Sequence, residues 1–143
     1  MSAAGSSRRA QPASSVVVTA ALDNFTSSDV RFLQEAARLG PLHVRLPSDA
    51  LVERSTRRPP IFPAAERRFV AASLRCVNTV AVVDRDAHED LARLASRFAT
   101  LVVREGVDDH RLSRAWKGRG GDLRTLSEAD LAGFPAWASV SSG

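Results

Sequence analysis

Hydrophobic and polar positions follow two alternating periods along the chain, one typical of buried strands and one typical of amphipathic helices. Residues 16–18 are three consecutive valines, an apolar β-branched run that predicts a strand covered on both faces. The polar residues 26–29 have the composition of a helix start, and helical spacing then continues to Gly40. Pro41 follows Gly40 and is a typical stop signal. We therefore predict a strand, a polar loop and a helix in this segment.

The same two periods predict four more strands and four more helices. The predicted strands are short apolar runs at residues 42–46, 79–83, 100–104 and 123–126. The predicted helices have apolar residues at helical spacing and cover residues 50–54, 63–75, 87–98 and a segment that starts near Asp108 and carries Leu112, Ala115 and Trp116. In the helix that follows Pro63, one face is expected to carry Phe69, Ala72, Ser73 and Cys76.

Strands that alternate with helical patterns predict right-handed βαβ units and a parallel sheet. We therefore expect an α/β fold, a three-layer sandwich around a Rossmann-like sheet of about five mainly parallel strands. Residues 1–15 contain mainly Ser, Ala, Gly, Arg and Pro, and predict a disordered tail before a single domain at residues 16–143. Ligands of such sheets bind where the strand order reverses, which makes the loop after residue 18 the expected site.

Composition narrows the classes of function. The 143 residues are 44% hydrophobic and 25% charged, as in an ordinary globular domain. No apolar run approaches the ~20 residues of a membrane span, and no secretory signal is visible before residue 16. We therefore expect no membrane partner and a cytoplasmic location. The single cysteine, Cys76, excludes an internal disulfide and a cysteine-based zinc site, and is interpreted as a small buried hydrophobic residue.

Charge and histidine spacing exclude two further kinds of site. The net charge is +4, and Lys117 is the only lysine among the basic residues. The arginines are scattered without interleaved aromatics, so we expect no nucleic-acid partner. His43, His88 and His110 share no metal-ligand spacing, and they predict neither a metal site nor a Ser-His-Asp arrangement.

Several short motifs occur in a fixed order between residues 16 and 126. Residues 20–23 read AALD, and the pattern LxxAxxLG follows at residues 33–40. Further motifs are SD at 48–49, RP at 58–59, ER at 66–67, TLVVR before Gly106, and Trp116 before a Gly-Gly pair. Together they resemble the cytidylyltransferase-like nucleotidyltransferases, most closely the glycerol-3-phosphate cytidylyltransferase and heptose-phosphate adenylyltransferase branch. That branch reads roughly GxFDxxHxGHxxxLxxAxxLGD after its first strand.

The differences from this family fall on its catalytic motif. The two histidines of HxGH, which hold the nucleotide phosphates in the family, are replaced here by Thr26 and Asp29. Loss of one preorganised donor commonly costs about 10²–10³ in rate, and a carboxylate at Asp29 is expected to repel phosphate. Ala20 replaces the glycine that lets the backbone approach the nucleotide. The family's lysine after the second strand has no lysine counterpart, and the candidates to replace it are Arg54, Arg57 and Arg58.

The resemblance implies a set of candidate ligand-binding residues, which consists of Ala20, Asp23, Ser27, Ser28, Arg57, Arg58 and Arg67. For several of these residues the sequence is also compatible with a purely structural role instead of ligand contact. Asp23 is also a common turn former, and the two serines are also ordinary helix caps. Arg67 is either a phosphate contact or an ion-pair partner of Glu66 or Asp49 on a solvated face.

The leading hypothesis is a degenerate nucleotidyltransferase-like protein, weakly active or inactive, that serves as a binding, regulatory or subunit-pairing module. It would bind a nucleotide or a phosphorylated small molecule and pair as a homodimer or with a partner protein. The first alternative is an active enzyme that uses CTP or ATP, with Mg²⁺, and joins CMP or AMP to a sugar or polyol phosphate with release of pyrophosphate. The second alternative is an α/β binding module that does not take nucleotides.

Overall fold

The computed structural model describes residues 14–106 and 110–135 and contains a five-stranded, all-parallel sheet in the order β3-β2-β1-β4-β5. The strands are β1 (Val16–Thr19), β2 (Leu42–Pro47), β3 (Val77–Val83), β4 (Thr100–Arg104) and β5 (Asp122–Leu126). The helices in these ranges are α2 (Ser27–Ala37), α3 (Asp49–Thr56), α4 (Ala64–Ala72), α5 (Ala87–Leu94) and α6 (His110–Gly118). The predicted Rossmann-like α/β fold is therefore confirmed. The predicted helix start near Asp108 lies outside the described residues.

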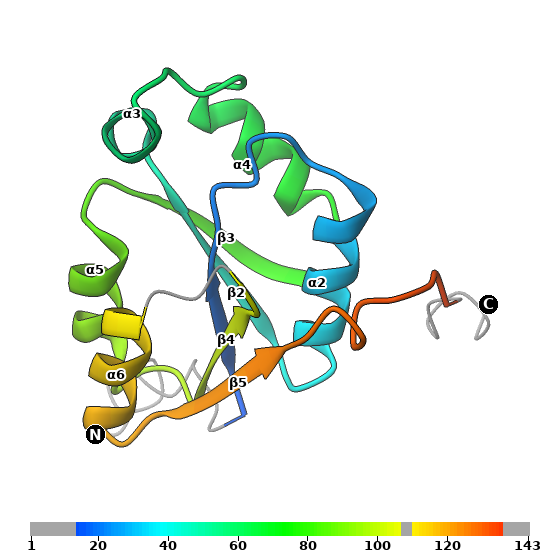
Figure 1. Cartoon of the computed structure of the whole chain (residues 1–143), viewed down its shortest axis with the longest axis vertical. Coiled ribbons are helices and arrows are strands. Elements are labelled where there is room, and N and C mark those ends of the chain that lie inside the picture. The colour runs from blue at the N-terminus through cyan, green and yellow to red at the C-terminus, as the bar shows by residue number, and fades with distance from the viewer. Residues whose placement is uncertain (1–13, 107–109, 136–143) are drawn as a thin grey trace, which may run out of the picture.

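Helices cover both faces of the sheet, with α2 and α4 on one side and α5 and α6 on the other (Figure 1). Val16 and Val18 belong to the core cluster under α2 and α4, which also contains Leu33. Val17 points to the opposite side and packs in the cluster of α5 and α6 with Trp116. The three-valine run is apolar throughout because each of its side chains enters one of two cores.

The order of the strands places a crevice beside β1. The chain passes from β1 to β2 and β3 on one side, and then returns to form β4 on the other side of β1. β1 therefore pairs with both β2 and β4, with Val16 in register with Leu42 and with Thr100. The connections after β1 and β4 run in opposite directions, which opens the carboxyl edge of the sheet between them.

Gly40 is required by a close approach of the chain to itself. Its φ is +152°, and a Cβ atom at this position would lie 1.8 Å from the carbonyl oxygen of Ser14. The next residue, Ser15, is buried, and its carbonyl oxygen accepts hydrogen bonds from the N–H groups of Ala99 and Thr100 at 3.1 and 3.2 Å. Residues 14 and 15, the described part of the predicted tail, therefore pack against the start of β4.

The prediction that Phe69, Ala72, Ser73 and Cys76 share one face of the helix after Pro63 is wrong. The helix ends at Ala72, before Ser73 and Cys76, and Phe69 is 74% exposed. The buried positions are Arg67 and Ala71, four residues apart and on the opposite side of the helix from Phe69. The prediction failed because Arg67 faces the core, whereas hydrophobic periodicity assigns every arginine to the solvent-facing side of a helix. Cys76 is half-buried, and burial raises the pKa of its thiol.

Candidate functional site

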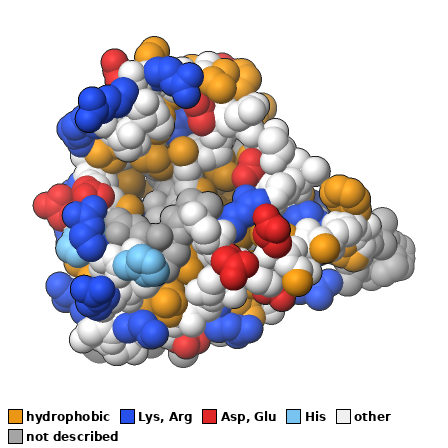
Figure 2. Space-filling model, viewed as in Figure 1, with side chains coloured by type: hydrophobic (Ala, Val, Ile, Leu, Met, Phe, Trp, Pro, Cys, Tyr) orange, Lys and Arg blue, Asp and Glu red, His pale blue; other side chains and the backbone are white. Residues whose placement is uncertain are grey.

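A cleft formed by two adjoining cavities lies at the carboxyl edge of the sheet. The first cavity has a volume of about 370 Å³ and the second about 630 Å³. Thr19, Ala20, Ala21 and Ala87 line both of them, so the two cavities share a wall at the end of β1. Figure 2 shows the hollow, with hydrophobic atoms inside it and basic side chains around it. Its position at the reversal of strand order is where sheets of this kind bind ligands.

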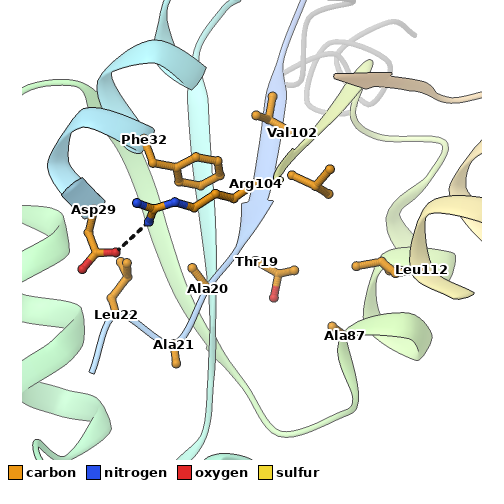
Figure 3. Close-up of a pocket in the computed structure, with 11 residues that line it drawn as sticks. Thr19, Ala20, Ala21, Leu22, Asp29, Phe32, Ala87, Val102, Arg104 and Leu112 are labelled. Atoms are coloured by element: carbon orange, nitrogen blue, oxygen red, sulfur yellow. Dashed lines mark hydrogen bonds and ion pairs between the residues drawn. The ribbon is translucent and has the colours of Figure 1, made fainter. Parts of the chain in front are cut away.

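The first cavity is mostly apolar and lies between β1, β4 and α2. Leu22, Phe32, Val102 and Leu112 are among the side chains that enclose it (Figure 3). A cavity with this lining suits the uncharged ring or chain of a small molecule.

Among the described residues that line the first cavity, the charged side chains form one ion pair. Arg104, the last residue of β4, lies 3.2 Å through Nη1 from Oδ1 of Asp29 on α2 (Figure 3). Its Nη2 donates to the hydroxyl of Ser28, and its guanidinium carbon is 5.9 Å from the centre of the Phe32 ring. The opposite charges neutralise each other, so this cavity offers no excess positive charge to a phosphate.

Asp29 also occupies the N-terminus of α2. Its Oδ2 accepts the backbone N–H of Thr26 at 2.9 Å, while the Thr26 hydroxyl accepts the backbone N–H of Asp29 at 3.4 Å. This reciprocal capping box follows directly from the Thr-Ser-Ser-Asp sequence. A helix N-terminus favours a bound anion, and here the carboxylate of the helix itself takes that place.

The second cavity is more polar than the first, and its described lining contains more basic than acidic side chains. Arg54 from the last turn of α3 and Arg111 from α6 line it, together with Asp86, the N-cap of α5. Arg54 is exposed, and Ser55 beside it adds a hydroxyl. Among the described residues that line this cavity, two guanidinium groups and one carboxylate give an arginine-rich wall, and arginine matches phosphate geometry well.

Asp23 binds the backbone of the connection between α3 and α4. Its two carboxylate oxygens accept the N–H groups of Ile61 at 2.7 Å and Phe62 at 2.9 Å, and Oδ1 lies 4.0 Å from Nε of Arg67. Partial burial works to raise the pKa of Asp23, but the two N–H donors and the charge of Arg67 together lower it. These contacts hold the loop after β1 to the segment that precedes α4.

Arg67 makes three hydrogen bonds inside the protein. Its guanidinium donates to the carbonyl oxygens of Phe62 and Ala21, both at 3.0 Å, and to Oδ1 of Asp49 at 2.8 Å. Its side chain is only 1% exposed. The ion pair with Asp49 is one of the alternatives predicted for this residue, and it joins a buried guanidinium to a carboxylate whose side chain is 48% exposed.

The other predicted site residues are dispersed. Ala20 lines both cavities of the cleft, whereas Ser27 and Ser28 are exposed at the start of α2. Arg57 and Arg58 are exposed beyond the end of α3 and line neither cavity. Of the three arginines considered as replacements for the family lysine, Arg54 is therefore the one at the cleft.

Sequence reasoning missed Arg104 and Arg111 as site residues. The position of Arg104 could have been predicted, because the last residue of an apolar strand in a parallel sheet lies at the carboxyl edge. Arg111 had no such signal, since its place at the second cavity depends on how α6 packs.

The histidines and acidic residues do not form a metal site in the part of the chain that the structure describes, where no group of three or more potential ligands comes together. His43 is buried, with Nδ1 2.7 Å from the Thr79 hydroxyl and its ring 5.2 Å from that of Phe98. Burial and the nearby charge of Arg97 lower the pKa of His43. None of the helices in these ranges is long and apolar enough to cross a bilayer.

Comparison with known proteins supports the fold. No family model matches the sequence, and no curated protein matches it. A lipopolysaccharide core biosynthesis protein from Thermoplasma volcanium GSS1 has a similar structure, with a TM-score of 0.63 and 17% identity over 79% of this chain and 93% of that chain. A protein of unknown function from Archaeoglobus fulgidus has a TM-score of 0.64 and 12% identity, covering 86% and 96%. At these identities the likeness concerns the fold alone.

Proposed function

We propose that this chain is a binding module for a small phosphorylated ligand and that it does not catalyse nucleotidyl transfer. The ligand occupies the cleft, with its uncharged part in the apolar first cavity and its phosphate beside Arg54 and Arg111 in the second. The observation that carries the proposal is the adjacency of these two cavities at the reversal of strand order. Their combined size suits a nucleoside monophosphate or a sugar or polyol phosphate.

The N-terminus of α2 is unsuited to nucleotidyl transfer. Nucleotidyl transfer needs preorganised positive groups on the phosphates, because positioning and charge stabilisation provide most of the catalysis. Here the carboxylate of Asp29 lies at that helix terminus, and it neutralises Arg104. A triphosphate in this position would meet a negative charge.

The resemblance to nucleotidyltransferases supports a phosphorylated ligand without identifying it. The motif order and the Rossmann-like sheet agree with that resemblance. The lipopolysaccharide core biosynthesis protein among the structural neighbours makes a sugar phosphate worth including among the test ligands.

The binding experiment is calorimetry with CMP, AMP, CTP, ATP, glycerol 3-phosphate and a hexose phosphate. We expect at least one monophosphate to bind. Arg54→Ala should weaken that binding about tenfold, because it removes a charged hydrogen-bond donor. Arg58→Ala is the matched control: it removes the same charge from a nearby exposed position outside the cleft, and should leave affinity unchanged.

Two outcomes would contradict the proposal. Release of pyrophosphate from CTP or ATP at an ordinary enzymatic rate, with Mg²⁺ and a polyol or sugar phosphate, would support the active enzyme instead. Absence of binding to every phosphorylated compound would favour an α/β module that takes a ligand without phosphate.

A further inference from the structure

A second surface with recognition features lies away from the cleft, on the outer side of α4. Ile61, Phe62, Phe69 and Val70 are all exposed there, Ile61 by 65% and Phe69 by 74%. We call these four residues the α4 surface. Large apolar side chains that remain exposed together on a folded domain commonly mark an interaction site.

A groove runs along one side of the α4 surface. It has a volume of about 260 Å³ and is lined by Leu22, Phe25, Phe62 and Val70, with Glu66 as its acidic residue. The loop after β1 forms the wall opposite α4. The volume accommodates one large side chain, such as leucine or phenylalanine, from another molecule.

Exposed arginines flank the residues of the α4 surface in the sequence. Arg57 and Arg58 precede it in the sequence, Arg68 lies beside Phe69 on α4, and Arg75 follows the helix. Within the described residues, none of these four arginines forms an ion pair. Hydrophobic and basic side chains lie next to one another over α3 and α4 in Figure 2.

We propose that the α4 surface binds an acidic protein segment. The segment inserts a large apolar side chain into the groove beside Phe62 and Val70, and its carboxylates face the flanking arginines. The apolar contact supplies affinity, and the complementary charge supplies orientation and speed of association. This interaction is separate from the phosphate site and requires no ligand in the cleft.

Two other occupants fit the observations less well. An anionic lipid surface has no side chain to fill the groove beside Phe62 and Val70. A second copy of this chain would bring one set of unpaired arginines against another, which opposes association.

The experiment selects binders from a displayed library of random peptides against the full-length protein. Enriched peptides should combine a large apolar residue with several Asp or Glu residues. For the tightest of them, Phe69→Ser should weaken binding at least about tenfold, as expected for an aromatic hot spot. Phe134→Ser is the matched control, since Phe134 is similarly exposed in a different segment, and it should not change affinity. Circular dichroism and thermal unfolding verify that both variants are folded.

A charge test and two alternative assays complete the design. Arg68→Glu should weaken the same peptide, and added salt should do so as well. Failure to enrich any peptide, enrichment of basic or neutral peptides, or equal binding by Phe69→Ser would overturn the proposal.

Sedimentation with vesicles of phosphatidylserine and phosphatidylcholine tests for lipid, and analytical ultracentrifugation tests for a second copy. Lipid binding or dimerisation that is lost in Phe69→Ser would assign the α4 surface to that occupant instead.

Discussion

Arg67 and Arg104 lie on opposite sides of the loop after β1, and each pairs with an aspartate in the first turn of a helix. Arg67 pairs with Asp49 of α3 at 2.8 Å, and Arg104 with Asp29 of α2 at 3.2 Å. The side chain of Arg67 is 1% exposed, whereas that of Arg104 is 28% exposed. On one side the arginine is buried and its aspartate is 48% exposed, whereas on the other side both partners are partly exposed at the edge of a cavity.

The difference lies in what each guanidinium holds together. Arg67 donates to two backbone carbonyls as well as to Asp49, so its loss removes the hydrogen bonds that join the loop after β1 to the segments around α3 and α4. Arg104 contacts two side chains at the N-terminus of α2, both of which water can reach. The buried Arg67 therefore stabilises the fold. Arg104, at the cavity edge, can bind a ligand in place of Asp29.

The largest effect is expected for Arg67→Met, which should lower the free energy of unfolding by about 1–3 kcal/mol, because it removes the hydrogen bonds of a buried guanidinium to two backbone carbonyls. Arg104→Met is the matched substitution and should cost about 1 kcal/mol or less, because a part-exposed pair contributes little. Urea denaturation of both variants provides the measurement. Equal losses of stability would show that the two pairs do not differ in the way their burial indicates.

The next effect concerns ligands and not stability. Asp29→Asn removes the carboxylate that neutralises Arg104, and should strengthen binding of inorganic pyrophosphate about tenfold, the usual value of one charged hydrogen bond. Calorimetry at low salt measures it. Glu53→Gln is the control, because it removes one negative charge from an exposed position on α3 outside both cavities. Unchanged pyrophosphate affinity in Asp29→Asn would show that Arg104 does not receive anions.

The smallest effect concerns Asp23, which lies beside Arg67, and the dependence of stability on pH. In the folded protein the pKa of Asp23 lies below its ordinary value of 3.8. A lowered pKa means that the ionised carboxylate stabilises the fold above about pH 3.8, and that this stability is lost as the pH falls through the folded-state pKa. Asp23→Asn should therefore be about 1 kcal/mol less stable than the parent near neutral pH, with a difference that shrinks in acid. Denaturation over a pH series measures the difference, and a gap that widens in acid would contradict the assignment.

Much of the fold could be predicted from local pattern. Three valines in succession required a strand buried on both faces, and the Thr-Ser-Ser-Asp sequence required a capped helix start. The prediction for α4 failed because Arg67 is buried and Phe69 is exposed, which is the reverse of what their hydrophobicity predicts. That exchange is stable only because Arg67 finds carbonyl acceptors that the helix itself does not contain.

The sequence by itself determined the α/β architecture and the position of the expected site at the end of β1. Only the tertiary structure decided which charged residues face the cleft and which are buried beneath it. Arg67 meets Ala21 across 46 positions and Arg104 meets Asp29 across 75. Hydrogen bonds between such distant segments depend on how helices pack against the sheet, and no local period in a single sequence records that packing.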